Sequence, residues 1–417
     1  MINALRRARR AALLTATLVA FAGCTMDVAN PGVIDATTFD PTADASTLSL
    51  SAQSNLYRAL GAMIPFTGFL AQEAWVGAVR AETNEIGRRV ATSNTSDINV
   101  SIWAPLQRAI ATNELAIETL AKGTSAASDI NLARANMNAG FALQLMAEDF
   151  CQGAFLVGPP LTPTQVGDTA IARFERALAI GGAAASAGVA EGTKVVNASN
   201  VGLARAYLQK KEYANAAAAA ARVSASFIYN AIAVDDASNR GLANGVHAYD
   251  VAGNYVVVPD AYRAMNDPRV QWKDSGKKAQ DTQLQYFQQL KYPGYATPIR
   301  IASGLEAQYI AAEAKLQQGD ASAALALIAA RRTVGGQPAF TGAGNAAILA
   351  ELMDQRAREF WLEGKRLGDI IRNPTAITNV PVTGAVFYKP SMGQYGSLTC
   401  LPVPLPEVLA NPNFPKS

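Results

Sequence analysis

The stretch that decides the fold is residues 356–372, RAREFWLEGKRLGDIIR. We expect residues 351–372 to form one helix, because apolar residues recur there at helical spacing: Phe360, Trp361, Leu367, Ile370 and Ile371. The charged residues alternate in sign at steps of three or four, which predicts ion pairs along a helix face: Arg356, Glu359, Glu363, Arg366, Asp369 and Arg372. Asn373-Pro374 then ends the helix. An acid/base pair of Glu359 and Glu363 for glycoside hydrolysis is the less favoured interpretation.

Upstream of this stretch, two segments have the pattern of tetratricopeptide hairpins, with small residues where two helices meet. The first holds Leu203, Ala204, Tyr207, Tyr213 and Ala216, and the second holds Ala311, Ala312, Gln318-Gly319-Asp320 and Ala324. From Ala216 to Ala324 is 324 − 216 = 108 residues. Neighbouring repeats of about 34 residues would lie much closer, so the pattern predicts an insertion between the hairpins.

The predicted insertion, residues 224–303, is rich in aromatic residues, Asn, Asp, Gly and Gln. Residues 255–258, Tyr-Val-Val-Val, predict a short strand within it. We expect His247, in a stretch rich in Gly and Asn, to be a solvated loop residue. A long irregular segment on a helical scaffold is typical of a binding surface.

Helical periodicity also covers most of the N-terminal half. We expect helices over the following residues: 48–78, 103–122, 132–149, 168–186, 194–209 and 212–224. Residues 80–100 are polar and predict a loop or a helix end followed by a loop. The fold class is therefore mainly α, a tetratricopeptide-like helical-hairpin scaffold with an irregular, loop-rich insertion. We divide it into a region 48–223 and a region 224–417, whose helices after the insertion span 303–373.

The N-terminus has the layout of a bacterial signal peptide. Four arginines precede an apolar run over residues 11–22, and small residues lead to Cys24. A membrane-spanning helix needs about 20 residues, so this run is too short to cross. The end of the run resembles a lipobox, which implies a signal peptide 1–23, lipidation of Cys24 and a tether over residues 24–47.

Charge, cysteine and histidine content exclude several functions. The formal net charge of +3 falls to 3 − 4 = −1 without the four arginines of residues 1–23, so the sequence does not indicate nucleic-acid binding. With Cys24 lipidated, Cys151 and Cys400 remain, and we favour a disulfide between them over two separate thiols. A single His argues against zinc sites and Ser-His-Asp catalysis. We predict no catalytic residue, no metal and no cofactor.

Residues 356–372 look like the C-terminal helix signature of the SusD/RagB family. Four further features agree with that resemblance in the same order: Asn30-Pro31; Trp103 with Ile110 and Asn113; Leu305-Glu306-Ala307 through Gly319-Asp320 to Arg331-Arg332; and Leu401-Pro402-Val403-Pro404 with Glu407 and Asn411-Pro412. The resemblance covers nearly the whole chain after Cys24. The sequence departs from the family by its short tail after Asn411-Pro412.

The resemblance implies an outer-membrane lipoprotein that faces outward. It also implies capture of a nutrient, commonly oligosaccharide, and delivery to a TonB-dependent SusC-like barrel transporter as its lid. Two alternatives stay open: a helical-repeat scaffold for protein complexes, and a peptide-binding member of the same family. A glycan-degrading enzyme is a third, disfavoured because no paired carboxylates stand out in the insertion.

For a sugar ligand, we expect aromatic rings to stack on the C–H faces of the rings and polar side chains to bind the hydroxyls. The candidate platforms are Trp75, Trp272, Tyr286 and Tyr292, and the candidate polar partners are Arg80, Asn84, Arg88 and Asn266. Trp103 and Trp361 lie within helical patterns, so we assign both to the core.

Overall fold

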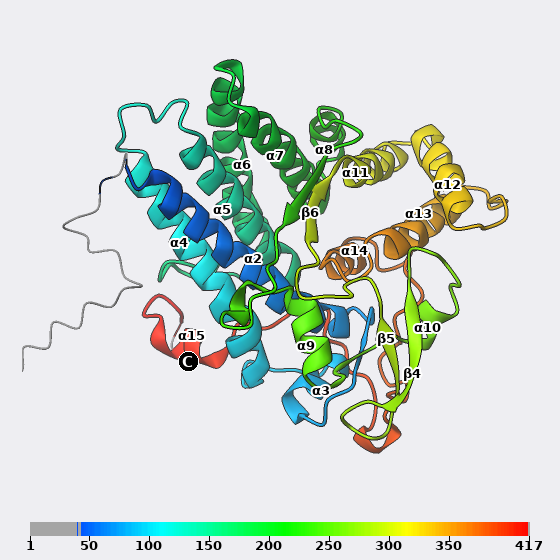
Figure 1. Cartoon of the computed structure of the whole chain (residues 1–417). Coiled ribbons are helices and arrows are strands. Elements are labelled where there is room, and N and C mark those ends of the chain that lie inside the picture. Colours follow the sequence, from blue (N-terminus) through cyan, green and yellow to red (C-terminus); the bar gives the residue numbers. More distant parts are fainter. Residues whose placement is uncertain (1–39, 41–42, 416–417) are drawn as a thin grey trace, which may run out of the picture. The chain divides into compact units, whose positions relative to one another are not determined.

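Helices dominate the part of the chain that the computed structural model describes, residue 40 and residues 43–415 (Figure 1). The predicted signal peptide, Cys24 and most of the predicted tether lie outside these residues. No helix within them combines the length and the apolar character that crossing a membrane requires.

The first long helix, α2 (Ala45–Leu70), packs on α4 (Ala104–Leu120) and α5 (Ile130–Asp149). It ends eight residues before the predicted boundary at residue 78, because Gln72 has a φ of +60° and the chain turns into β1 (Trp75–Val76). The predicted loop 80–100 instead contains α3 (Ala81–Gly87) and the start of a π-helical turn, η1 (Ile98–Trp103). Trp103 is buried, as predicted.

The two predicted hairpins are present and pack on each other (Figure 1). After α6 (Pro163–Ser186), the first consists of α7 (Ala190–Gln209) and α8 (Tyr213–Ala220). The second consists of α11 (Gly304–Gln317) and α12 (Ser322–Val334), with Gly319 at a φ of +93° in its turn. Because α8 lies directly against α11, the helical array continues across the insertion.

The insertion leaves this array through a two-stranded neck, in which β2 (Ile228–Ala231) pairs antiparallel with β6 (Ile299–Ser303). Beyond the neck lie η2 (Arg240–Leu242), α9 (Gly245–Gly253), β3 (Val256–Val257), α10 (Asp260–Arg263), β4 (Trp272–Lys278) and β5 (Gln285–Gln289). A four-stranded sheet with the order β1-β3-β5-β4 joins the insertion to the N-terminal region. The predicted short strand is confirmed, while the insertion is more regular than predicted.

The prediction for His247 is wrong. It lies in α9 with only 7 % of its surface exposed. Its Nδ1 is 2.9 Å from the carbonyl oxygen of Tyr292, and its ring meets that of Tyr295 edge-on. These contacts cross about 45 residues of chain, so tertiary packing buries a residue whose local sequence is typical of a loop.

The predicted single helix 351–372 is two helices, α13 (Asn345–Glu359) and α14 (Arg366–Arg372). The chain breaks between them, where Leu362 and Gly364 have φ values of +53° and +69°. Trp361 is fully buried there, as predicted, and donates a 2.9 Å hydrogen bond to the carbonyl oxygen of Glu73. The break turns the charged residues toward the protein interior.

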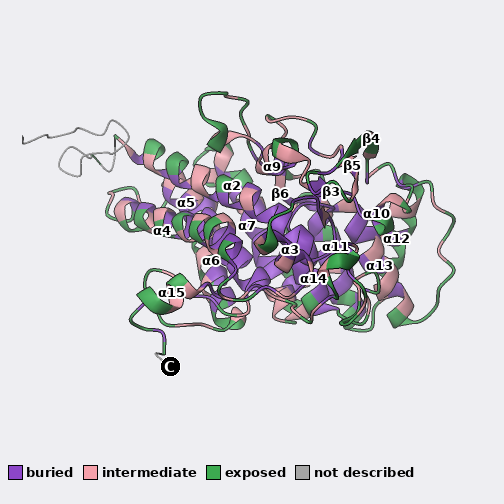
Figure 2. Cartoon of the chain, turned by 90° about the horizontal axis from the view of Figure 1, so that it is seen from below, coloured by how far each residue is buried: buried purple, intermediate pink, exposed green. Residues whose placement is uncertain are grey.

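The C-terminal segment holds η3 (Pro390–Met392) and α15 (Leu405–Ala410) and returns to the N-terminal helices. A disulfide joins Cys151 to Cys400, the pair favoured from the sequence. Beside it, Leu401 donates a 2.7 Å hydrogen bond to the carbonyl oxygen of Asp149. Figure 2 shows the buried residues gathered along the inner faces of α2, α7 and α14, while α15 is largely exposed.

Candidate functional site

A groove of about 640 Å³ lies between α2, the η1–α4 segment, η2 and α9. One face of α2 forms its floor, through residues three or four positions apart: Asn55, Arg58, Ala62 and Phe66. Successive turns of α9 form one wall, through Gly245, Ala248, Tyr249 and Ala252, and Ala104, Pro105 and Arg108 of α4 form another. Its volume is in the range of about 300–1,000 Å³ that is usual for ligand sites.

The groove is hollow because its walls carry small side chains. Ala62, Ala104, Ala248 and Ala252 end at Cβ and leave the space between the helices unfilled. Below them, α9 crosses α2 backbone to backbone, since a Cβ on Gly245 would lie 2.5 Å from the carbonyl carbon of Gly61. The glycine at 245 therefore sets the distance between the two helices.

An aromatic cluster closes one end of the groove. Phe66 and Tyr249 have ring centroids 5.3 Å apart, and Tyr249 lies 5.1 Å from Tyr255. Phe66 is buried, while Tyr249 is partly exposed at the groove surface. Burial raises the pKa of Tyr249 to about 12, so the phenol stays neutral at physiological pH. Its ring is an apolar surface with a polar tip, suited to a sugar ring.

Three arginines supply the charge of the groove, and no acidic residue among those that the structure describes lines it. Arg58 donates from Nε to the carbonyl oxygen of Gly241 at 2.8 Å. Arg240 lies 3.8 Å above the centre of the Tyr295 ring and pairs with Asp235. The Arg108 side chain is exposed and makes no hydrogen bond or ion pair with any residue that the structure describes.

The predicted aromatic platforms lie outside this groove and apart from one another. Trp75 on β1 stacks on Tyr388, with ring centroids 4.6 Å apart, while Trp272 lies on β4 at the opposite edge of the sheet. Tyr286 and Tyr292 are only 3 % and 2 % exposed. Their hydroxyls bind the Asp250 carboxylate and the Leu362 carbonyl oxygen. Tyr286 and Tyr292 therefore belong to the core, which corrects the prediction that their rings are exposed platforms for stacking.

Three of the predicted polar partners flank α3 near Trp75. Arg80 pairs with Asp97 at 2.8 Å, and Arg88 reaches the carbonyl oxygen of Gln394 at 3.4 Å. Asn84 is buried, and its amide is held by the Ala78 carbonyl oxygen and by Lys389 Nζ. Asn266, by contrast, is exposed in a separate turn with a φ of +44°. The three polar residues lie on or at the ends of α3, which packs on the β1 strand that carries Trp75, but their side chains have separate partners and none of the four residues lines the groove.

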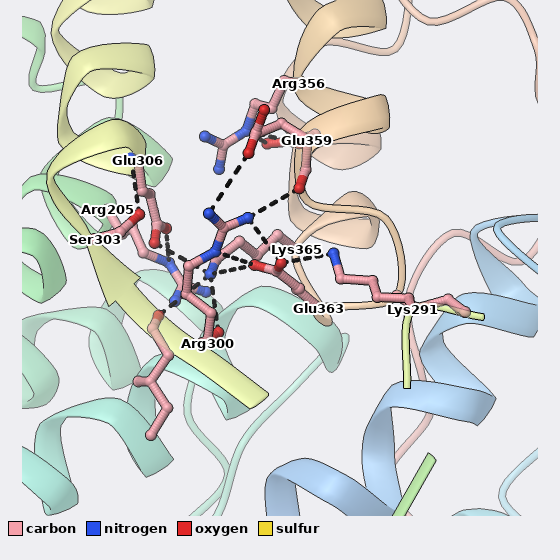
Figure 3. Close-up of polar contacts among 12 residues, drawn as sticks. Arg205, Lys291, Arg300, Ser303, Glu306, Arg356, Glu359, Glu363 and Lys365 are labelled. Atoms are coloured by element: carbon pink, nitrogen blue, oxygen red, sulfur yellow. Dashed lines mark hydrogen bonds and ion pairs between the residues drawn. The ribbon is translucent and has the colours of Figure 1, made fainter. Parts of the chain in front are cut away.

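Glu359 and Glu363, the alternative acid/base pair, belong to a buried network of ion pairs (Figure 3). Arg300 contacts both carboxylates, at 3.5 Å and 2.8 Å, and Arg331 binds Glu359 at 2.6 Å. Burial alone would raise the pKa of Glu363, but Lys291, Arg300 and Lys365 outweigh it and lower the pKa to about 2. A glutamate with this pKa is a poor general acid, which argues for the ion-pair interpretation.

Solved structures with the same fold cover nearly the whole chain. A SusD superfamily protein of Parabacteroides distasonis matches with a TM-score of 0.66 and 14 % identity, over 91 % of this chain and 99 % of that chain. Surface glycan-binding protein A of Bacteroides uniformis matches with a TM-score of 0.65 and 14 % identity, over 90 % and 99 %. A SusD-like carbohydrate-binding protein of Bacteroides vulgatus matches with a TM-score of 0.63 and 16 % identity, over 90 % and 98 %.

In sequence, residues 265–396 match the model of the SusD family. This match covers about a third of the chain, and the described part of the chain shares its fold with solved SusD superfamily proteins. The matched residues include the stretch 356–372 and the part of the insertion that follows α10. No curated protein sequence matches the chain.

The groove residues Phe66, Tyr249 and Arg108 were not selected from the sequence. Phe66 fits the apolar pattern of α2, and Arg108 reads as an ordinary surface residue of α4. A signal was present near Tyr249: small residues recur at 245, 248 and 252 on the same helix face. Such a stripe indicates a close helix crossing.

Proposed function

We propose that this chain is a cell-surface lipoprotein that binds oligosaccharide in the groove between α2, α4 and α9. The observation that carries the proposal is the pairing of an aromatic surface, Tyr249, with unused hydrogen-bond donors on Arg108 and Arg58. Sugar rings offer apolar C–H faces and many hydroxyls, so a site for them combines ring stacking with hydrogen bonds.

Similar structures support the ligand class. Two of the proteins with this fold are named for binding glycan or carbohydrate. The finer parts of the proposal rest on the family resemblance: delivery to a TonB-dependent SusC-like barrel, attachment through Cys24, and a location on the outer face of the outer membrane. Burial removes Asn84 from the predicted contacts. The other predicted residues remain candidates for separate additional contacts with a longer glycan: Trp75, Arg80, Arg88, Asn266 and Trp272.

The contacts of Glu359 and Glu363 support a protein that binds its ligand without catalysing a reaction. Glu359 pairs with arginines, Glu363 pairs with Arg300 and two lysines, and neither lines the groove. The proposed role is therefore capture of the ligand rather than its hydrolysis.

Calorimetry with the soluble chain from residue 25 onward tests the ligand class. We expect heat of binding with at least one oligosaccharide in a panel of plant and host glycans, and a loss of about tenfold or more in affinity on Tyr249→Ala, since aromatic contacts of this kind contribute ~0.5–1.5 kcal/mol beyond the buried area. Binding to peptides with no binding to any glycan would overturn the proposal.

The cellular part needs a separate test. In intact cells, added protease should cleave the lipoprotein if it faces outward and should spare it if it faces the periplasm. A Cys24→Ser variant should lose labelling by a fatty-acid analogue. Purification of the native protein in mild detergent should bring a TonB-dependent barrel with it; recovery of the lipoprotein alone under those conditions would count against the transporter role.

A further inference from the structure

We infer that the groove selects oligosaccharides that carry acidic sugars, with the carboxylate or sulfate group bound between Arg58 and Arg108. This inference rests on the proposed function, because it names the class of sugar that the same groove binds. Four features carry it: the alignment of the two arginines, their free donors, the charge of the lining and the place of the aromatic wall.

The two arginines lie at the same level of an antiparallel helix pair. Asn113 of α4 donates a 3.1 Å hydrogen bond to the Ala52 carbonyl oxygen of α2, and Asn55 of α2 donates at 3.3 Å to Thr112 Oγ1 of α4. The two helices α2 and α4 therefore run antiparallel at this contact. Arg58 is one turn after Asn55, and Arg108 is one turn before Thr112, so both side chains project from matching positions into the groove.

Both guanidinium groups keep donors for a ligand. Arg58 is held by Gly241, whose missing side chain makes room, since a Cβ there would lie 2.1 Å from Arg58 Nη2. That nitrogen reaches Asn239 Oδ1 at 3.3 Å, while Nη1 has no partner among the described residues. Arg108 has no side-chain partner at all within the described part of the chain. Arg58 is thus positioned and Arg108 is free.

The groove lining is positively charged at Arg58 and Arg108, and no acidic side chain of the described residues neutralises these two arginines. Within the described part of the chain, Arg240 is the one lining arginine with an acidic partner, Asp235, and no Asp or Glu borders the groove. The chain after residue 23 has a formal net charge of 3 − 4 = −1. The groove is therefore positively charged, although the chain as a whole carries a slight negative charge. Two like charges at one level repel, and an anion between them removes that cost and accepts charge-assisted hydrogen bonds.

Tyr249 would position the sugar ring that carries the acidic group. Tyr249 lies on the α9 side of the groove, across from α4. A sugar ring stacked on Tyr249 would point a ring substituent toward the arginines. A carboxylate or sulfate ester at that position would receive the guanidinium donors, whereas a neutral hydroxymethyl group would leave two positive charges uncompensated.

The test uses pairs of oligosaccharides that differ only in charge, titrated into the chain from residue 25 onward. One pair is oligogalacturonate and its methyl ester; the other is a sulfated oligogalactan and its desulfated form. The variants are Arg108→Gln in the groove and Arg222→Gln as a control, since Arg222 is exposed on the far hairpin and makes no side-chain pair among the described residues.

We expect at least one acidic member to bind tenfold or more tighter than its neutral partner, with an affinity that falls as salt is raised. Arg108→Gln should weaken only the acidic member, by about tenfold to a hundredfold, as expected for a charge-assisted hydrogen bond. Arg222→Gln should change neither. Equal affinity for charged and neutral members, or an Arg108→Gln variant with wild-type affinity, overturns the inference and leaves glycan binding intact. Binding to no glycan, or only to acidic peptides, overturns both.

Discussion

Arg300 on β6 forms an ion pair with the buried carboxylate of Glu363, in the break between α13 and α14, with Nη2 2.8 Å from Oε1. The two residues are 63 positions apart. Lys291, from the insertion, adds a second ion pair to the same carboxylate at 2.6 Å. One carboxylate therefore fastens the insertion and its neck to the C-terminal helices (Figure 3).

Replacing this carboxylate should destabilise the protein strongly. Glu363→Gln leaves Arg300, Lys291 and Lys365 with one negative charge fewer, and breaking a buried pair in this way costs about 3–5 kcal/mol. Urea denaturation at pH 7 measures the loss. Glu118→Gln is the control, because Glu118 is exposed and, among the described residues, pairs with Lys122 alone; its effect should stay within about 0.5 kcal/mol. A Glu363→Gln variant as stable as this control would show that the network does not hold the insertion.

Protonation of the Glu363 carboxylate should lower the stability of the protein at acidic pH. The pKa of Glu363 is lowered in the fold from 4.5 to about 2. A depressed pKa contributes stability that is present above the unfolded value and is lost as pH falls through the folded value. The difference between wild type and Glu363→Gln should therefore shrink between about pH 4.5 and about pH 2, as measured by urea midpoints at each pH. A constant difference over that range would contradict the assignment.

Glu73 should have the opposite effect on the pH dependence of stability. It is buried beside Leu362, whose backbone N–H donates to Oε1 at 3.3 Å, and burial raises its pKa from 4.5 to about 8. An acid with a raised pKa loses stability as pH rises from the unfolded to the folded value, by up to about 1.4 kcal/mol per pH unit. Glu73→Gln keeps an acceptor for Leu362 and removes this loss. We expect the variant to gain stability relative to wild type between pH 5 and pH 8; an equal difference at both values would contradict the raised pKa.

The disulfide should stabilise the C-terminal segment against the N-terminal helices. Cys151 and Cys400 are separated by 249 residues, and removing a cross-link over a long loop typically costs about 2–5 kcal/mol. Cys151→Ser, Cys400→Ser and the double variant should show similar losses in thermal unfolding, because either change alone breaks the bond. A reductant should lower the midpoint of wild type only. Unchanged midpoints for all three variants would show that the backbone bonds around Leu401 suffice.

The floor of the groove depends on Gly245. Gly245→Ala places a Cβ 2.5 Å from the Gly61 backbone and must push α9 away from α2. We expect a loss of about 1–3 kcal/mol from overpacking, together with weaker oligosaccharide binding as Tyr249 moves. The control is Gly182→Ala in α6, which meets nothing within 4 Å and should gain up to about 1 kcal/mol. If Gly245→Ala behaved like the control, the close crossing would not be a constraint.

Much of the fold followed from helical periodicity, and the departures have local causes. Helix pairs at α7–α8 and α11–α12 were predicted from small residues at facing positions, and the structure has both pairs. The predicted bounds 194–209 and 212–224 of the first pair are close to those of α7 and α8. The break in the C-terminal helix was missed because Leu362 has a φ of +53°, which a leucine gives no reason to expect. The buried Trp361 and Glu363 hold it there.

The groove was harder to predict, because its walls come from segments far apart in the chain. The aromatic residues of the insertion were recognised as a group, yet which of them reach a surface depends on tertiary contacts. Tyr292 is buried against Leu362, whereas Tyr249 borders the cavity because Gly245 lets α9 cross α2 closely. Residue type suggested sugar binding, whereas the groove that we propose for it follows from the packing of α9 on α2.

A crystal structure of the chain with a bound oligosaccharide tests the central claim most directly. The account predicts electron density for a sugar ring against Tyr249, with hydroxyl or acidic groups within hydrogen-bond distance of Arg58 and Arg108. Density at Trp75 or Trp272, with the groove between α2, α4 and α9 left empty, would contradict it.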